Sequence, residues 1–199
     1  RIARIYEGTN EINRMLSVGM LVKKAMKGHV DLLGPASEVQ AELMGIPSFE
    51  TPDYSELFAE EKEMIGKLKK AFLMVAGGAV QKYGPDLDGH QQLLMAAADI
   101  LIEIYMAEST ILRTEKLAKT KGEAAVKEQI AMAQLYLYKA VDIITQKGKE
   151  GIVSFAEGDE QRMMLMGLRR YTKYTNMPNV IGLREIITSK LVAENAYCF

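Results

Sequence analysis

The sequence has almost no cysteine and no long apolar run. Its single thiol, Cys198, cannot form an internal disulfide or a cysteine metal cluster, so a reducing cytosolic setting is the default expectation. No apolar stretch approaches the roughly 20 residues that span a bilayer. A signal peptide and an initiator methionine are also missing, so we expect that the natural N-terminus is absent and that targeting cannot be deduced from this chain.

Charge imbalance and histidine are scarce too. The 25 basic residues oppose 26 acidic ones, and the resulting charge of −1 gives no long-range attraction to nucleic acid or anionic lipid. The two histidines, His29 and His90, are far apart and lack the Glu-x-x-His spacing of a di-iron bundle. Asp86 and Asp88 lack the acidic ladder of a calcium loop. We therefore expect no metal site, and interpret these aspartates as part of a turn and a helix cap.

The sequence does contain a helical pattern along nearly its whole length. Hydrophobic residues make up 48% of the chain, enough for a core, and recur at spacings of three and four without strand alternation. A first helix begins at Thr9 or Asn10, either of which can cap it, and ends near Lys27-Gly28. Its apolar stripe consists of Ile12, Met15, Leu16, Gly19 and Met20.

Residues 28–52 interrupt this pattern with recurring glycine and proline, including Pro47 and Pro52. We interpret them as a connector with one short helix over residues 37–43. Long helices follow from about residue 53 to Tyr83, from a cap at Asp88 to Lys121, and from about residue 126 to Gly148 or Gly151. Shorter ones span about residues 157–175 and the segment after Asn179. Long helices joined by short loops predict an all-α fold, an antiparallel helical bundle.

Two groups of charged residues are also informative. Asp99, Glu103 and Glu108 lie on or near one face of a predicted helix, where they could pair with basic residues of a neighbouring helix. The basic runs at residues 67–70 and 169–170 are interpreted as solvated helix faces.

The opening stretch carries the chemistry. Residues 4–14 read RIYEGTNEINR, so the carboxylate of Glu7 directly precedes a glycine at a helix start. Gly8 permits backbone angles closed to other residues and allows close approach, and the free N–H groups of a helix start suit phosphate or polar cofactor atoms. Shielding by Tyr6 would raise the pKa of Glu7 and make it a stronger base for a weak carbon acid. The residues alone leave two interpretations open: a base beside a cofactor, or an acidic residue in a capping turn.

This stretch resembles the signature near the end of the catalytic region of acyl-CoA dehydrogenases. That signature is an aromatic residue, Glu-Gly-Thr, a polar pair, Ile, a polar residue and Arg, and each position matches here. The rest of the chain is similar, more loosely, to the extra helical domain of the very-long-chain branch. The resemblance implies that residues 1–27 end the catalytic region, residues 28–52 form the connector and residues 53–199 form an appended helical-bundle domain.

The resemblance also implies roles for individual residues. Glu7 matches the catalytic base that removes the α-proton of an acyl-CoA thioester, while the β-hydride passes to N5 of FAD and a trans-2-enoyl-CoA forms. Gly8 matches the residue beside the thioester. Thr9, Asn10 and Glu11 match the segment that contacts FAD. Because some branches place the base elsewhere, glutamate at position 7 indicates the commoner arrangement.

The same resemblance implies what completes the enzyme. An N-terminal helical domain and a middle β-domain, which enclose FAD, would precede Arg1. We therefore predict that the isolated chain retains no FAD, is inactive, and serves assembly or dimerisation. The intact parent would work in fatty-acid β-oxidation, pass electrons to electron-transfer flavoprotein and form a homodimer. Its acyl chain-length preference depends on residues outside this chain.

One alternative is a non-enzymatic helical module for protein interaction or membrane docking. The very-long-chain relatives dock through the region that corresponds to residues 28–52, but a surface-binding helix needs a basic face. Here the region carries Asp31, Glu38, Glu42 and Glu50, with only His29 as a possible cation. We therefore favour assembly over membrane docking. A bacterial cytoplasmic parent is favoured over one in the mitochondrial matrix or at the inner-membrane surface.

Overall fold

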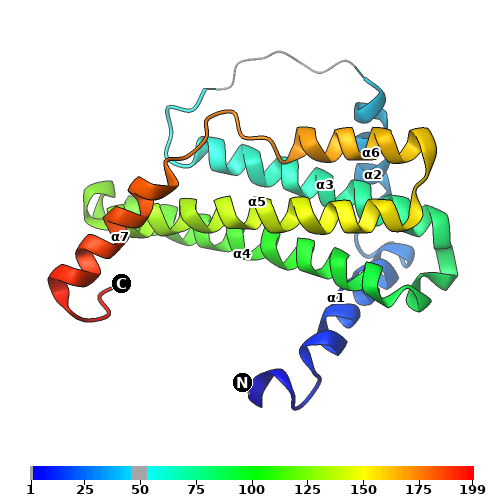
Figure 1. The fold of residues 1–199 in the computed structure, drawn as a ribbon, viewed down its shortest axis with the longest axis horizontal. Coiled ribbons are helices and arrows are strands. Elements are labelled where there is room, and N and C mark those ends of the chain that lie inside the picture. The colour runs from blue at the N-terminus through cyan, green and yellow to red at the C-terminus, as the bar shows by residue number, and fades with distance from the viewer. Residues whose placement is uncertain (1, 46–52) are drawn as a thin grey trace.

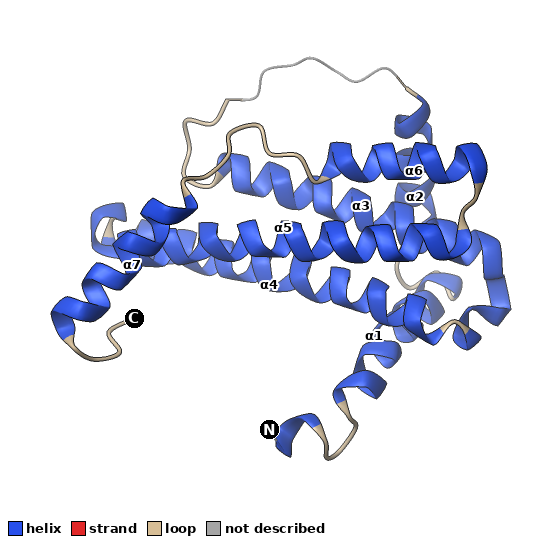
Figure 2. Cartoon of the chain, in the orientation of Figure 1, coloured by secondary structure: helices blue, strands red, loops and turns tan. Residues whose placement is uncertain are grey.

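In the computed structural model, residues 2–45 and 53–199 are described, and they contain helices and loops but no strand (Figures 1 and 2). The masked Pro47, Glu50 and Pro52 of the predicted connector lie outside these residues, as does Arg1. The main bundle consists of α3 (Ala59–Tyr83), α4 (Gln91–Lys121), α5 (Lys127–Phe155) and α6 (Gly158–Tyr171). Successive helices run in opposite directions (Figure 1). The predicted all-α antiparallel bundle is therefore confirmed.

Three further helices lie around the bundle. α1 (Asn10–Met26) packs against α4 and extends away from the bundle toward the N-terminus (Figure 1). α2 (Leu33–Met44) packs on α3 and α6, and α7 (Val180–Glu194) packs on α5. Short 3-10 helices are η1 (Ile2–Arg4), η2 (Gly84–Gly89) and η3 (Glu123–Val126). None of the helices in residues 2–45 and 53–199 has the length and apolar character to span a bilayer.

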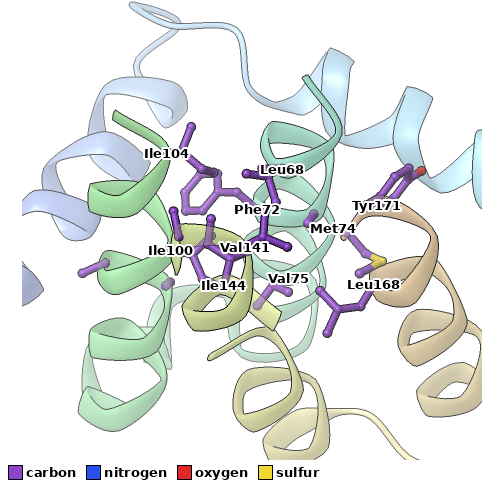
Figure 3. Close-up of a cluster of buried hydrophobic side chains, with 14 of the residues drawn as sticks. Leu68, Phe72, Met74, Val75, Ile100, Ile104, Val141, Ile144, Leu168 and Tyr171 are labelled. Atoms are coloured by element: carbon purple, nitrogen blue, oxygen red, sulfur yellow. The ribbon is translucent and has the colours of Figure 1, made fainter. Parts of the chain in front are cut away.

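The hydrophobic core lies where α3, α4, α5 and α6 meet (Figure 3). Each helix contributes side chains at three- and four-residue spacings, which places them on one face. Burying each large apolar side chain contributes about 1.5–3 kcal/mol. The labelled members are Leu68, Phe72, Met74 and Val75 of α3, Ile100 and Ile104 of α4, Val141 and Ile144 of α5, and Leu168 and Tyr171 of α6.

Glycines within α5 allow the close approach of its neighbours. A Cβ at Gly148 would lie 2.7 Å from Cδ1 of Leu168, and one at Gly151 would lie 3.0 Å from Cγ1 of Val75. Both glycines are therefore packing positions in a continuous helix. The prediction that this helix ends near Gly148 or Gly151 is wrong, because α5 continues to Phe155.

Helix ends with strong local signals agree with the sequence prediction. α1 is capped by Thr9, α3 ends at Tyr83 before Gly84, α4 ends before Gly122, and α7 is capped by Asn179, whose side chain accepts a hydrogen bond from the Gly182 N–H at 3.1 Å. The predicted cap at Asp88 is wrong. Residues Gly84–Gly89 form η2, and α4 begins at Gln91 without a side-chain cap.

α2 is longer than the predicted helix over residues 37–43, because it begins at Leu33. Pro35 lies in its first turn, where a missing backbone N–H removes no helical hydrogen bond. Oδ1 of Asp31 accepts a hydrogen bond from the N–H of Gly34 at 3.0 Å, which satisfies one of the free donors at this end. Glycine and proline here therefore mark a helix start, and their interpretation as helix breakers is wrong.

Ion pairs join α2 to two bundle helices. Glu42 binds Nζ of Lys70 in α3 at 2.6 Å and an Nη of Arg170 in α6 at 3.3 Å. Lys69 of α3 binds Glu108 of α4 at 2.6 Å, as predicted for that glutamate. Lys69, Lys70 and Arg170 belong to the basic runs that were interpreted as solvated helix faces. That interpretation is incomplete, because these side chains are partly exposed and also connect separate helices.

Candidate functional site

The residues around Glu7 form a tight turn between η1 and α1. The N–H groups of Ile5 and Tyr6 donate to the carbonyl of Ile2 at 2.9 and 3.3 Å, which closes η1. Glu7 and Gly8 then both adopt positive φ, 53° and 93°. Positive φ is uncommon for a residue with a side chain, so Glu7 holds a sparsely populated backbone conformation.

Gly8 is required here for two separate reasons. Its φ of 93° disfavours any residue with a Cβ. Its carbonyl also accepts a 2.8 Å hydrogen bond from Nδ2 of Asn13, and a Cβ at Gly8 would lie 2.8 Å from Oδ1 of the same side chain. The backbone freedom predicted for this glycine is therefore used in the structure.

Thr9 is the N-cap of α1. Its Oγ1 accepts from the N–H of Ile12 at 3.4 Å, and its carbonyl accepts from the N–H of Asn13 at 2.9 Å. Asn10 begins the helix and Glu11 lies in the first turn, where the helix dipole favours a carboxylate. The first N–H groups of a helix have no partner within it, so this end can bind an anionic or polar group.

The five predicted residues, Glu7 to Glu11, thus form one continuous turn and helix start, but the described chain does not enclose them. Glu7 is exposed, and Tyr6 is 55% exposed. The shielding of Glu7 by Tyr6 that the sequence suggests is not provided by the described residues alone. By itself the turn can only present a carboxylate and a helix N-terminus to solvent.

α1 has apolar side chains on two sides. Val18 faces the bundle and is only 3% exposed, whereas Ile12, Leu16 and Met20 are 53%, 54% and 48% exposed. Most of the stripe identified from the sequence therefore points away from the bundle. A helix that is apolar on both sides is typical of one buried between two layers.

Arg14, the last residue of the signature, connects this helix to the bundle. Its Nε lies 3.1 Å from Oδ1 of Asp99 in α4, and the two side chains are 36% and 19% exposed. Asp99 was expected to pair with a basic residue of another helix, and it does. Glu103 differs, because it accepts a 2.9 Å hydrogen bond from the hydroxyl of Tyr136. The role of Arg14 was missed because only the packing of α1 on α4 brings it near Asp99.

Possible metal ligands do not converge in this structure. Within residues 2–45 and 53–199, no three His, Cys, Asp or Glu side chains are placed to hold a metal ion. The ring of His90 instead stacks on Tyr83, with centroids 3.6 Å apart. The turn at Glu7 is therefore the candidate site with the best defined geometry.

Comparison with known proteins identifies the family. The model of the family "Acyl-CoA dehydrogenase, C-terminal domain" matches residues 67–170, which cover most of α3 to α6. This chain belongs to the acyl-CoA dehydrogenase family. A protein of Bacillus subtilis (strain 168) described as a probable acyl-CoA dehydrogenase is 39% identical over 194 residues, which are 98% of this chain and 32% of that protein.

A solved acyl-CoA dehydrogenase has the same fold. The crystal structure of an acyl-CoA dehydrogenase complexed with FAD from Bacillus anthracis superposes with a TM-score of 0.92 at 41% identity, covering 100% of this chain and 33% of that one. The chain thus spans about a third of the length of the acyl-CoA dehydrogenases it matches. The family model covers the bundle and not residues 4–14, so the bundle and the opening signature point independently to one family.

Proposed function

We propose that this chain is the C-terminal part of an FAD-dependent acyl-CoA dehydrogenase of the very-long-chain type. The parent would oxidise acyl-CoA to trans-2-enoyl-CoA, with Glu7 as the base that removes the α-proton. The observation that carries the proposal is the backbone at Glu7 and Gly8, with φ of 53° and 93°. Strained residues persist where a defined geometry is needed, and here the strained residue carries a carboxylate directly before a glycine and a helix N-terminus.

The remaining residues of the turn fit a polar cofactor. Gly8 would lie beside the thioester, as the family resemblance implies, and the half-buried Thr9 and Asn10 lie beside the free N–H groups of α1. Together with Glu11 they would bind polar atoms of FAD. When bound, FAD supplies the acceptor for the β-hydride. Glu7 would accept the α-proton on a carboxylate oxygen, as a general base.

The proposed domains are residues 1–27 as the end of the catalytic region, residues 28–52 as the connector and residues 53–199 as the appended bundle. The outward side of α1 supports the first boundary. Ile12, Leu16 and Met20 are about half exposed on this chain, and a contiguous apolar surface of this kind is typical of a contact with another part of a protein. The preceding catalytic region would cover them.

The isolated chain would therefore hold no FAD and would not turn over substrate. Glu7 and Tyr6 are both exposed on it, so nothing described here separates the base from water. Purified chain should show no flavin absorbance after desalting. Stoichiometric flavin in that preparation would contradict this part of the proposal.

In the proposed parent, the bundle would contact a second subunit and so hold together a homodimer. α4 carries apolar side chains on one exposed face, namely Ile102, Tyr105, Met106 and Leu112, which are 40%, 68%, 44% and 52% exposed. An exposed apolar stripe of this kind suits a contact with a second subunit. We further propose that the parent works in fatty-acid β-oxidation, passes electrons to electron-transfer flavoprotein and is a bacterial cytoplasmic protein. The family resemblance supports the first two, and the two Bacillus relatives support a bacterial parent.

Membrane docking through the connector has less support. α2 contains no basic residue, and Glu42 of α2 already pairs with Lys70 and Arg170. An interfacial helix would need a cationic face instead. The non-enzymatic interaction module remains the competing function, and the flavin experiment below separates it from the enzyme.

The test uses the full-length parent without oxygen. Acyl-CoA substrates of increasing chain length are added while flavin bleaching is followed in the wild type and in Glu7→Gln. We expect bleaching in the wild type and its loss in the variant at unchanged flavin content, with Glu38→Gln, an exposed glutamate of α2, as the matched control.

Each other result has a defined meaning. Bleaching that survives in Glu7→Gln would place the base elsewhere and leave Glu7 as a residue of the capping turn. A wild-type parent that contains no flavin would favour the interaction module.

A further inference from the structure

An apolar cavity lies between α1, α2, α3 and the start of α6, apart from the turn at Glu7. Its volume is about 410 Å³, within the range of roughly 300–1,000 Å³ that is usual for small-molecule sites. Its deepest residues are almost completely buried and all apolar: Val18 (3% exposed), Val39 (4%), Phe72 (6%), Met74 (6%) and Met164 (5%).

α3 carries small residues where it lines the cavity. Ala76, Gly77 and Gly78 form part of its floor, and a Cβ at Gly77 would lie 3.4 Å from Cβ of Ala36 in α2. These small side chains therefore let α2 approach α3 closely at one side of the cavity. Atoms that line the cavity lack contact partners on one side, so an apolar ligand that fills it gains contacts.

Ion pairs hold the two covering helices in place. Arg14 connects α1 to Asp99 of α4, and Glu42 connects α2 to Lys70 of α3 and to α6. These contacts connect α1 and α2 to different helices of the bundle.

The opening of the cavity is polar but carries no positive charge. Its polar lining residues, Ser37, Gln40, Gln81 and Glu160, are all exposed, so they lie at the rim. Among the described residues, no lysine or arginine lines it. A hydroxyl and two amides can hydrogen-bond an uncharged head group, whereas the carboxylate of Glu160 repels an anionic one.

We propose that this cavity binds the alkyl chain of an uncharged amphiphile, with the hydroxylated head group at Ser37, Gln40 and Gln81. The methionines of the lining, Met26, Met74, Met163 and Met164, suit a flexible chain because their unbranched side chains adapt to its shape. Acyl-CoA and free fatty acids are anionic and are disfavoured at Glu160. The ligand class therefore differs from the substrate proposed for Glu7.

The test is a titration of the 199-residue chain with the apolar fluorophore 1-N-phenylnaphthylamine. Bound probe is then displaced by 1-monolauroylglycerol or by laurate, both below their aggregation concentrations. We expect saturable probe binding, displacement by monolauroylglycerol and several-fold weaker displacement by laurate. In Glu160→Gln, laurate should approach the affinity of monolauroylglycerol. Equal displacement by both compounds in the wild type, or no probe binding at all, would overturn the proposal.

Variants locate the bound probe. Ala76→Phe fills the cavity from α3 and should abolish binding, and Ala25→Phe fills it from α1 if the first variant does not fold by circular dichroism. Ala41→Phe makes the same change on an exposed position of α2 outside the lining and should leave binding intact. Binding that survives both filling variants would overturn the proposal.

Two further results would also overturn the proposal. Probe binding that is lost in Leu16→Ser would place the probe on the outward side of α1. Probe binding by the chain but not by the full-length parent would show that another segment of the parent occupies the cavity.

Discussion

At the scale of single residues, the glycines of the bundle differ in what surrounds them. A Cβ at Gly148 of α5 would lie 2.7 Å from Leu168, whereas one at Gly66 of α3 would have no atom within 4 Å. Gly78 is as crowded as Gly148, with Phe155 at 2.8 Å. The same residue type therefore permits close helix packing at one position and only loosens a helix at another.

Alanine substitution should separate these two roles. Gly148→Ala should lower the free energy of unfolding by about 1–3 kcal/mol, because Leu168 must move from its packed position. Gly66→Ala, the matched control, should raise it by about 0.5–1 kcal/mol, because alanine favours the helix. Urea denaturation measures both. Equal effects of the two substitutions would show that α5 and α6 approach less closely than described.

One half-buried tyrosine, Tyr136, and one buried tyrosine, Tyr171, predict sensitivity to alkali. Burial, with the hydrogen bond to Glu103, raises the pKa of Tyr136 from 10.0 to about 12, and burial raises the pKa of Tyr171 to about 12. Each folded phenol binds its proton more tightly than the unfolded one. Their contribution to stability is therefore complete below pH 10.0 and is lost as pH rises toward about 12.

The measurement is the free energy of unfolding across that alkaline range. It should fall with rising pH in the wild type and fall less steeply in Tyr136→Phe. Tyr197→Phe is the control, because that ring is 84% exposed. An unchanged slope in Tyr136→Phe would mean that its hydroxyl is not buried against Glu103.

At the same scale, the candidate site could be predicted only in part. Thr9 as a cap and Gly8 as a residue with special backbone angles follow from local chemistry, which the sequence displays directly. The positive φ of Glu7 could not be predicted, because glutamate has no preference for it. The pair between Arg14 and Asp99 depends on contact between helices distant in the sequence.

At the scale of helices, α2 depends on Glu42. This carboxylate binds both Lys70 and Arg170, and α2 has only one buried residue, Val39. Because all three charged side chains are partly exposed, each pair contributes only about 0.2–1 kcal/mol. Loss of the two ion pairs of Glu42 should therefore destabilise α2 alone and not the whole bundle.

Glu42→Gln should speed amide hydrogen exchange in α2 and leave exchange in α5 unchanged, because Glu42 connects α2, a helix with a single buried residue, to the bundle. Glu38→Gln, an exposed position of the same helix, is the control and should change neither. Faster exchange throughout the bundle would instead assign Glu42 a role in global stability.

Helix ends and faces show why some elements could be predicted and others not. Gly84 after Tyr83 and Gly122 after Lys121 stop their helices by backbone chemistry, and the sequence shows this. Gly148 does not end α5, because this glycine serves the close packing of Leu168 from α6 against the helix. The outward side of α1 was equally hidden, since a helix with two apolar sides gives no signal for which side meets the bundle.

At the scale of the whole molecule, the assembly proposal accounts for the exposed apolar face of α4. Tyr105, at 68% exposure, lies near the middle of the face formed with Ile102, Met106 and Leu112. Such side chains remain in water on an isolated subunit. Their removal from water would favour association.

Tyr105→Glu in the full-length parent should therefore convert a dimer to a monomer in sedimentation velocity, since a charge in an apolar contact is costly. Val153→Glu is the matched control, because Val153 of α5 is 54% exposed and belongs to another face. A parent that stays dimeric in both variants would place the subunit contact elsewhere.

The two-sided character of α1 has a consequence for enzyme inactivation. Val18 lies against the bundle, Leu16 faces away from it, and Glu7 precedes the same helix. Heat that melts the bundle would release α1 from it, and the carboxylate of Glu7 would lose its fixed position without any chemical change to the residue. In the proposed parent, thermal loss of activity should then follow the melting of the bundle, and substitutions deep in the bundle should shorten the working lifetime of the enzyme while leaving its initial rate unchanged.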